Sequence, residues 1–395
     1  MAKLLDGLVV LDLTRVLAGP FCTMILADLG ARVIKIEPPG GDEARQFGPF
    51  VDSHSVYFAN VNRGKESVVL DLKTPEGQRL ARLLSERADV LIENFRPGSL
   101  TRLGLGYDDL KIKNPRLVYA SVSGFGQTGP YRNRGAYDIV IQAMSGLMGI
   151  TGASGGPPTR VGASIGDITP ALFATIGILS ALHQRSESGQ GCYLDIGMLD
   201  AAVAIVENAM GRFSATGQNP EPIGNRHPTI APFSSFETAD GFVVIAAGND
   251  GLFARLCQVV NRPDLAIDER FVTNDARTRN VDALTANLGE VLLTRSSADW
   301  LTDLERAGVP AGRVNQLSDL IGDEHLRARR MIVSIDHPGI GELLGPGNPI
   351  KARGFSDDVS NPSPRLGQHT KKVLRELAEL SSAEMGRLAD QGPAQ

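Results

Sequence analysis

The stretch GLVVLDLTRVLAGPFCTMILADLGARVIKIE, residues 7–37, holds two short apolar runs with a glycine-bounded segment between them. Residues 7–13 and 31–37 are short, apolar and rich in β-branched side chains, and this composition predicts two buried strands. Between them, Pro20 is expected to open a helix that ends at Gly30. A strand, a helix and a second strand joined by short turns form a βαβ unit, which predicts a parallel sheet.

Further strands follow along the first half of the chain and extend the same sheet. They are expected at residues 67–72, 89–93, 116–121 and 191–196, with an amphipathic helix beginning at Pro75. This alternation predicts a doubly wound α/β domain over residues 1–215. Ligands bind such sheets at the carboxyl ends of the strands. The loops at that edge are rich in Gly, Arg and Asn, and they cover residues 14–20, 38–45, 94–98 and 123–135.

The second part of the chain has a different composition. Residues 216–229 are rich in Gly, Asn and Pro without periodicity, which indicates a linker. Beyond it, a strand hairpin and several helices predict a small α+β domain of residues 230–330, after which residues 331–395 return to the first domain. The expected elements are strands at 233–238, 241–246, 331–335 and 354–356, a helix at 198–215, and tail helices at 369–380 and 381–389, the last with a capping box of Ser381 and Glu384.

Composition narrows the class of protein. The 395 residues carry a net charge of −5 with both signs dispersed, so no bulk attraction to nucleic acid or to anionic membranes is expected. Three cysteines far apart suggest neither a disulfide framework nor a thiolate metal site, and a cytoplasmic location is expected. The apolar helix after Pro170 is expected to be too short and too glycine-broken to span a membrane.

Several familiar motifs are absent or incomplete. Residues 124–129 match G-x-G-x-x-G after a strand, but a dinucleotide fingerprint must also open a helix at once. Here residues 130–135 form a loop, so dinucleotide binding is disfavoured. The sequence has no P-loop and no clustered histidines, so no metal site is expected. Residues 152–156 and 162–166 match G-x-S-x-G, but neither follows an expected strand as a nucleophile elbow does, so a serine hydrolase is disfavoured.

The strongest chemical candidate is Asp167. Residues 162–170 form a glycine-spaced loop that delivers this acid to the start of an apolar helix. Beside the positive end of a helix dipole its carboxylate is expected to stay ionised, and such a carboxylate can act as a nucleophile. The alternative is that Asp167 only caps the helix. Thr169 and Pro170 can serve as cap and first helical residue instead, which would free Asp167.

Basic residues on the same loops suit a phosphate-bearing ligand, because Arg in particular binds phosphate through two hydrogen bonds. Tyr137 is a candidate hydrogen-bond donor to a substrate oxygen, or simply a core aromatic. At Gly248 and Asn249, a strand-to-helix turn offers backbone N–H groups to an anion, or is an ordinary capped turn. The basic candidates are Arg45, Arg63, Lys65, Arg96 and Arg102.

Taken together, these pieces resemble the family III coenzyme A transferases, also called the formyl-CoA transferase/carnitine CoA-transferase family (CaiB/BaiF type). Each motif is weak alone, but their order and spacing are specific, and they run through nearly the whole chain. The motifs are LDLTRVLAGP at 11–20, GARVIKIE at 30–37, NRGK at 62–65, LDLK at 70–73, ENFRPG at 93–98, SGFGQTGP at 123–130, Tyr137-Asp138 and Gly166-Asp167.

The resemblance implies a Rossmann-like large domain, a smaller domain and an interlocked homodimer. It implies that Asp167 is the catalytic nucleophile and that no metal or cofactor is needed beyond CoA itself. CoA would move from a donor acyl-CoA to an acceptor acid through an aspartyl anhydride and an aspartyl-CoA thioester. The implied substrate-binding residues are Arg15, Tyr137, Gly248 and Asn249, and the implied CoA-binding residues are Arg45, Asn94, Phe95, Arg96, Arg102, Gly124 and Gly126.

Two alternatives stay open beside the transferase. The fold also carries α-methylacyl-CoA racemases, whose catalytic histidine falls where this chain has Tyr137, and an un-ionised tyrosine is a poor proton acceptor. A non-catalytic CoA-binding protein is the other alternative, but it need not keep Asp167. Residues 248–251 lack the longer glycine run of oxalate-type transferases, which favours succinyl-CoA as donor and a small dicarboxylic acid as acceptor. Arg15, Arg45 and Arg160 are candidates to bind the distal carboxylate.

Overall fold

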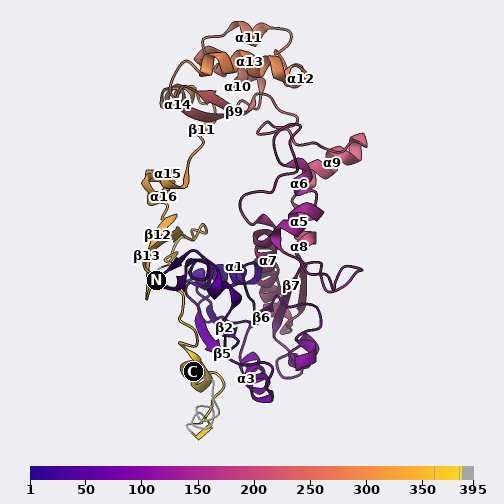
Figure 1. Ribbon diagram of the computed structural model, residues 1–395, viewed down its shortest axis with the longest axis vertical. Helices are drawn as coiled ribbons and strands as arrows, with labels where there is room; N and C mark the ends of the chain where they lie inside the picture. Colours follow the sequence, from indigo (N-terminus) through magenta and orange to yellow (C-terminus); the bar gives the residue numbers. More distant parts are fainter. Residues whose placement is uncertain (360, 382, 385–395) are drawn as a thin grey trace. The chain divides into compact units, whose positions relative to one another are not determined.

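The computed structural model describes residues 1–359, 361–381 and 383–384, and the chain forms two compact units. The first unit combines Met1–Leu147, Val161–Gly211 and the described part of Glu324–Gln395, and the second combines Met148–Arg160 with Arg212–Asp323. Figure 1 shows the chain coloured from one terminus to the other, with its elements labelled.

The first unit is built on a six-stranded parallel sheet, as predicted. Its order is β5-β2-β1-β6-β7-β8, so the sheet grows in one direction from β1 to β5 and in the other from β6 to β8. The βαβ prediction is confirmed, because β1 and β2 pair in parallel with Leu11 opposite Ile34. The strands are β1 (Val9–Asp12), β2 (Arg32–Glu37), β5 (Glu66–Val69), β6 (Val90–Glu93), β7 (Val118–Ser123) and β8 (Tyr193–Gly197).

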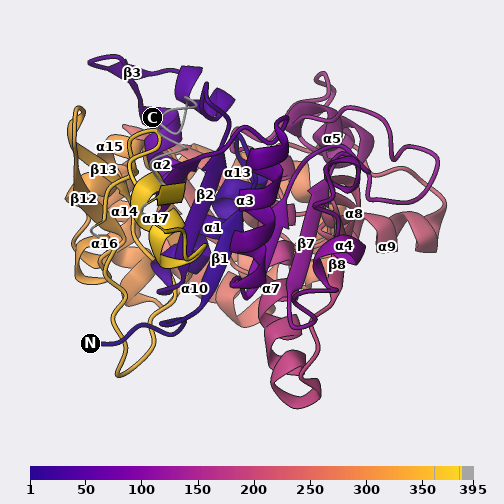
Figure 2. The same cartoon turned by 90° about the horizontal axis from the view of Figure 1, so that it is seen from below.

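Helices cover both faces of this sheet (Figure 2). On one face, α3 (Pro75–Glu86) and α17 (Thr370–Glu376) pack Leu80, Leu84 and Val373 against strand residues such as Leu11 and Ile34. On the other face, α1 (Ala18–Asp28) packs against α7 (Ile165–Ser188) and the central strands. The remaining elements are η1 (Glu43–Gln46), β3 (Phe50–Val51), β4 (His54–Ser55), α2 (Val56–Asn62), η2 (Thr101–Leu103), α4 (Tyr107–Leu110), α5 (Asp138–Met144), α8 (Met198–Ala204), α16 (Glu324–Ala328), β12 (Ile332–His337) and β13 (Gly341–Pro346), with α6 (Leu147–Ile150) and α9 (Glu207–Thr216) at the junctions of the units.

The second unit is a three-stranded antiparallel sheet packed on helices. The predicted hairpin is confirmed: β9 (Phe233–Thr238) pairs with β10 (Gly241–Ala246), and Gly241 lies opposite Thr238. A third strand, β11 (Ala311–Arg313), was not predicted, because it is only three residues long. Phe236, Phe253 and Trp300 form part of a separate buried core. The helices are α10 (Asp250–Val259), α11 (Asp264–Ile267), α12 (Asn274–Arg279), α13 (Val281–Leu292), α14 (Ser297–Arg306) and α15 (Leu317–Gly322).

Some expected elements differ in the structure. The helix expected at 198–215 is two helices, α8 and α9. The strand expected at 354–356 is wrong, since β12 pairs with β13 instead. The capping box is confirmed, because Ser381 and Glu384 exchange hydrogen bonds between side chain and backbone N–H. The rest of the helix expected at 381–389 lies outside the described residues.

The helix that carries Asp167 is longer than predicted. It begins at Ile165, so Pro170 lies inside it and not at its start. By length and composition α7 could cross a membrane, so the expectation that this helix is too short and too glycine-broken to do so is wrong. It also packs on α1, α8, β7 and β8, as a core helix of a globular unit does, so composition alone does not place it in a membrane.

Candidate active site

The sheet order reverses between β1 and β6, and a crevice is expected where the chain leaves these two neighbouring strands. A pocket of about 200 Å³ lies there, and Asp167 is part of its wall. The pocket, which we call the switch-point pocket, is lined by Arg15, Val16, Leu17, Ala18, Glu43, Asn94, Phe95, Arg96, Pro97, Val122, Ser123, Gly124, Arg132, Arg134, Gly135, Ala136, Tyr137, Asp167 and Met198.

Asp167 lies in the first turn of α7, three residues after the N-cap residue Ser164. The side chain of Ser164 makes no capping bond. Among the described residues, no hydrogen-bond donor contacts the Asp167 carboxylate, so the capping alternative does not account for this residue. Its carboxylate is left to face the pocket.

A second carboxylate, that of Asp138, fixes the turn that carries Asp167. Asp138 Oδ1 accepts a hydrogen bond from the Gly166 N–H at 2.8 Å, and both its oxygens accept from Gln142 Nε2. Gln142 in turn accepts a hydrogen bond from the Val161 N–H at 2.8 Å. A Cβ atom on Gly166 would lie 2.9 Å from the Asp138 carbonyl oxygen, so this close approach requires glycine.

The acidity of Asp167 differs from the sequence expectation. Burial, together with the nearby charge of Asp138, raises the pKa of Asp167 to about 7. Both effects oppose the ionisation that the helix dipole is expected to favour. Tyr57 on α2 shares this environment: burial and the charges of Asp167, Asp42 and Asp138 raise its pKa to about 12.

Arg15 and the loop after β6 meet at the mouth of the pocket. Asn94 accepts a hydrogen bond from the Arg15 N–H at 2.9 Å and donates one to the Arg15 carbonyl at 2.8 Å. The Arg15 guanidinium lies 5.7 Å from the centre of the Phe95 ring and pairs with Glu43 at 2.5 Å. The two predicted loops are thus brought together, because the oxygen and the nitrogen of the Asn94 side-chain amide both bind the Arg15 backbone.

The next residue, Val16, adopts a backbone conformation that is unusual for a β-branched side chain. Its φ angle is +66°, in the left-handed region. Its N–H donates to the two oxygens of the Asp42 carboxylate, at 3.1 and 3.3 Å. Asp42 is itself held by the buried ammonium of Lys35 at 2.8 Å. Strained residues of this kind cluster at ligand-binding sites, and Val16 lines the pocket.

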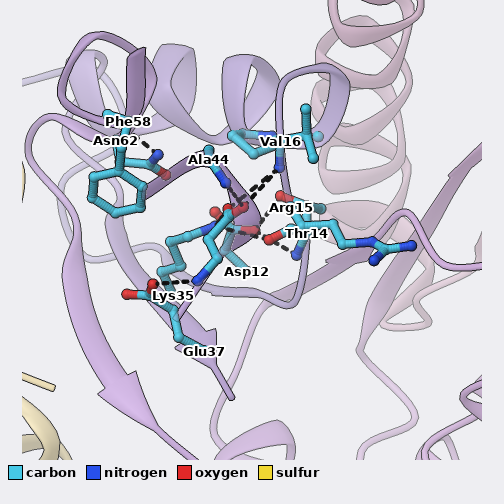
Figure 3. A network of polar contacts seen from close by, with 12 residues as sticks. Asp12, Thr14, Arg15, Val16, Lys35, Glu37, Ala44, Phe58 and Asn62 are labelled. Atoms are coloured by element: carbon cyan, nitrogen blue, oxygen red, sulfur yellow. Dashed lines mark hydrogen bonds and ion pairs between the residues drawn. The ribbon is translucent and has the colours of Figure 1, made fainter. Parts of the chain in front are cut away.

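A buried ionic network supports this loop from below (Figure 3). Asp12 accepts hydrogen bonds from Lys65 Nζ at 3.1 Å and from the hydroxyls of Thr14 and Thr23. Burial opposes ionisation of Asp12, but the charges of Lys65 and Lys35 outweigh it and lower its pKa to about 2. Lys35 also donates to the Thr14 carbonyl at 2.8 Å. The network fixes the start of the loop, while the Arg15 side chain points away from it.

Two of the basic residues suggested for phosphate binding are buried, and a third, half-buried one is held in an ion pair. Lys65 is buried against Asp12, and Arg63 is buried against Asp28 at 2.6 Å, so their assignment to a phosphate is wrong. Arg45 binds both oxygens of Glu37 at 2.7 Å, with its guanidinium 3.7 Å from the centre of the Phe58 ring. A contact between Arg45 and CoA would have to share or break that pair.

Other cations in the pocket were missed by the sequence analysis. Arg132 and Arg134 lie on the long loop after β7, and Arg134 stacks on Tyr131 at 3.8 Å. Within the described part of the chain, neither Arg96 nor Arg132 has an ion-pair partner. In the sequence, Arg132 and Arg134 lie in the five-residue segment PYRNR between Gly129 and Gly135, a composition typical of an ordinary surface loop.

The remaining predicted residues are distributed as follows. Tyr137 lines the pocket and is 73% exposed, whereas Arg102 and Gly126 do not line it. Arg102 donates to the Ser99 hydroxyl at 3.2 Å. Gly248 and Asn249 belong to the second unit, where the Asn249 side chain caps α10 by accepting from the Leu252 N–H at 2.9 Å. The capped-turn alternative therefore describes the Asn249 side chain correctly.

A second pocket of about 260 Å³ adjoins the first and shares Arg15, Glu43 and Phe95 with it. Most of its wall is apolar, from Ile36, Pro38, Leu70, Leu72, Leu100 and Leu103. The described residues contain no group of three or more His, Cys, Asp or Glu side chains arranged to hold a metal ion.

Known proteins share this architecture along nearly the whole chain. A model of CoA-transferase family III matches residues 5–370. The acetyl-CoA:oxalate CoA-transferase of Acetobacter aceti is 48% identical over 377 residues, which are 94% of this chain and 95% of that protein. The succinyl-CoA:mesaconate CoA-transferase of Haloarcula hispanica is 42% identical over 382 residues, which are 94% and 96% of the two chains.

A solved structure agrees with these relatives. The crystal structure of a CAIB/BAIF family protein from Brucella suis has a TM-score of 0.85 and 40% sequence identity, and covers 95% of this chain and 100% of its own. Because the family model and the full-length relatives agree, the chain belongs to CoA-transferase family III and is an enzyme that transfers coenzyme A between carboxylic acids.

Proposed function

We propose that Asp167 is the nucleophile of a CoA transfer from succinyl-CoA to a small dicarboxylic acid. The observation that carries the proposal is the Asp167 carboxylate itself. It faces the switch-point pocket with no hydrogen-bond donor from the described residues, whereas the neighbouring Asp138 carboxylate is fully used in holding the turn. A partly desolvated carboxylate without a partner is free to attack a bound acyl group.

The proposed reaction conserves charge and needs no oxidant or reductant. The Asp167 oxygen attacks the thioester carbonyl of the donor and expels the CoA thiolate, which leaves an aspartyl–acyl anhydride. The thiolate then attacks the Asp167 carbonyl carbon, forms an aspartyl-CoA thioester and releases the donor acid as its carboxylate. The acceptor carboxylate then attacks the aspartyl-CoA thioester and expels the CoA thiolate, which leaves an aspartyl–acceptor anhydride. The thiolate attacks the acceptor's carbonyl carbon, which yields the acceptor acyl-CoA and restores the Asp167 carboxylate.

Cations and adjoining pockets support a place for CoA. Arg96, Arg132 and Arg134 supply positive charge for its phosphates. The backbone N–H groups at the start of α1, which no side chain caps, offer further donors to an anion or a developing oxyanion. We place the adenine in the adjoining apolar pocket. Phe95 lines both pockets, and Asn94 and Gly124 line the switch-point pocket, so these three residues are placed to contact the CoA chain, whereas Arg102 and Gly126 line neither pocket.

The choice of acids rests on Arg15 and on the relatives. Of the three Arg residues proposed for a distal carboxylate, Arg15 lines the pocket and pairs only with the half-exposed Glu43, Arg45 is engaged by the buried Glu37, and Arg160 belongs to the second unit. A charged hydrogen bond of this kind contributes roughly 1.5–3 kcal/mol, or about ten- to a hundredfold in preference. The Haloarcula relative is named for succinyl-CoA and mesaconate, a donor and a dicarboxylic acceptor of the proposed kind, whereas the Acetobacter relative is named for acetyl-CoA and oxalate.

We also propose a cytoplasmic homodimer. Leu172, Phe173 and Ile176 on α7 are 45%, 40% and 59% exposed in the single chain, on the helix that carries Asp167. Exposed apolar side chains on one helix favour a partner surface, and a second copy of the chain fits the family. The three cysteines are free, as expected in a reducing compartment.

The test is chemical trapping of the intermediate. Enzyme incubated with succinyl-CoA and then with hydroxylamine should carry a hydroxamate on Asp167 by mass spectrometry, and Asp167→Ala should be inactive and unlabelled. A racemase on this fold would instead exchange the α-proton of its substrate with solvent deuterium and leave Asp167 unmodified. No histidine is found among the described residues that line the pocket, which argues against the racemase.

Substrate choice is tested separately. Succinyl-CoA should exceed butyryl-CoA in kcat/KM as donor by about ten- to a hundredfold, for the reason given above. Mesaconate, itaconate, malate and glutarate should be compared with acetate, oxalate and carnitine as acceptors. If carnitine or oxalate proves the best acceptor, or if butyryl-CoA equals succinyl-CoA, the proposed acid pair is wrong although the transferase stands.

A further inference from the structure

The side chain of Ser123, the last residue of β7, is an exception among the buried hydroxyls near the site. Ser123 is 6% exposed, and its Oγ has no hydrogen-bond partner among the described residues. Buried polar groups are nearly always bonded, because an unmet hydroxyl loses its hydration without compensation. Ser123 also lines the switch-point pocket together with Asp167. An unsatisfied donor in the wall of a pocket indicates that a bound molecule supplies the missing hydrogen-bond acceptor.

Another serine of the same strand shows that the fold satisfies such groups elsewhere. Ser121, two residues earlier, donates to the Glu93 carboxylate and accepts from the Tyr193 hydroxyl at 3.1 Å. Ser85 on α3, also buried, donates to the Arg82 carbonyl at 2.6 Å. The lack of a partner is thus particular to Ser123, and serine as such does not explain it.

The Ser123 hydroxyl is also held on a rigid support. β7 lies between β6 and β8, and Ser123 is in register with Gly197 of β8. Just beyond it, a Cβ atom on Gly124 would lie 2.4 Å from the Ala136 Cβ, so the following loop packs closely on the end of the strand. A donor fixed in this way is preorganised, in contrast to the long side chains of Arg132 and Arg134.

We propose that Ser123 Oγ donates a hydrogen bond to the carbonyl oxygen of the acyl group that reacts at Asp167. This inference rests on the proposed function of Asp167. The thioester carbonyl oxygen of a bound acyl-CoA becomes a carboxylate oxygen when the acid leaves, so one donor serves both forms. The same oxygen carries negative charge in the tetrahedral intermediate between them, and there the hydrogen bond is strongest. Ser123 forms no covalent bond in this scheme.

The test compares Ser123→Ala and Ser123→Cys with the control variant Ser85→Ala. We expect Ser123→Ala to lower kcat about ten- to a hundredfold, the range for a hydrogen bond to a charged group. Its melting temperature should be unchanged or higher, because the lost hydroxyl is unbonded in the free protein. Ser123→Cys keeps the size but is a weak donor, so its kcat should also fall. Ser85→Ala should lose stability and keep its kcat.

Three results would overturn the inference. Unchanged kcat in Ser123→Ala would show that the hydroxyl makes no contact with the reacting acyl group. Parallel loss of kcat and melting temperature in both Ser123 variants would show a structural role. An increase in KM with unchanged kcat would show contact with a part of the substrate that does not react. Asp167→Ala is measured beside them: if it is active, the proposed function fails, and if it is inactive while Ser123→Ala is fully active, only the role of Ser123 fails.

Discussion

Asp167 has to lose its proton before it can attack a thioester. Burial and the charge of Asp138 raise the pKa of Asp167 to about 7. The ionised fraction of Asp167 is therefore small in acid and becomes the majority only above neutral pH. We therefore expect kcat/KM, which reports on the free enzyme, to rise with pH through about 7 and then level off. Rate profiles with saturating acceptor would show this limb.

The charge of Asp138 can be removed without removing its hydrogen-bond acceptor. Asp138→Asn keeps an oxygen for the Gly166 N–H while taking away the repulsion that Asp167 experiences. The rising limb of kcat/KM should therefore move to lower pH in this variant. A limb that stays in place would mean that burial alone sets the pKa of Asp167, and a falling limb near neutral pH would contradict the nucleophile assignment.

Two glycines of the helix α7 differ in the space around them, so alanine substitutions at the two positions can be compared directly. Gly166 lies in the turn that carries Asp167, where an added Cβ would approach the Asp138 carbonyl oxygen to 2.9 Å. Gly177 lies farther along the same helix, where an added Cβ would meet the Leu194 Cδ1 at an ordinary 3.5 Å. We expect Gly177→Ala to keep activity and gain up to about 1 kcal/mol of stability from better helix propensity.

Gly166→Ala should behave in the opposite way. The contact with the Asp138 backbone forces the turn apart, which displaces Asp167 and should lower kcat at least about tenfold, since small displacements of reacting groups are costly. Thermal melts and steady-state rates of the two variants side by side check this. Equal activity of both would show that the turn tolerates the displacement.

The same helix shows how far sequence reasoning reaches. Periodicity and β-branched runs predicted all six strands of the parallel sheet, because these patterns are local. Pro170 predicted the start of α7 at the wrong place, since tertiary contacts of Gly166 with Asp138 allow the helix to begin earlier. Lys65 and Arg63 looked like ligand-binding cations, and only the fold reveals the carboxylates of Asp12 and Asp28 beside them.

For the molecule as a whole, we expect a dimer that persists on dilution. Ile176 is 59% exposed on α7 within an apolar stretch, whereas Ile112 is 75% exposed after α4 between two lysines. Ile176→Glu should therefore produce monomer or poorly soluble protein, while Ile112→Glu should leave the assembly intact. Sedimentation velocity at nanomolar concentration distinguishes these outcomes, and a folded wild-type monomer would exclude the dimer.

The buried network beneath Val16 has a consequence for the response of the enzyme to ionic strength. Mobile ions cannot enter around Asp12 and Lys65, so added salt leaves their attraction unscreened. The pair of Arg15 and Glu43 at the pocket mouth is about half exposed, and salt screens it readily. Concentrated salt should therefore weaken the pair of Arg15 and Glu43 at the pocket mouth and leave the buried pair of Asp12 and Lys65 intact. The guanidinium is then released from Glu43 and becomes available to an incoming anion.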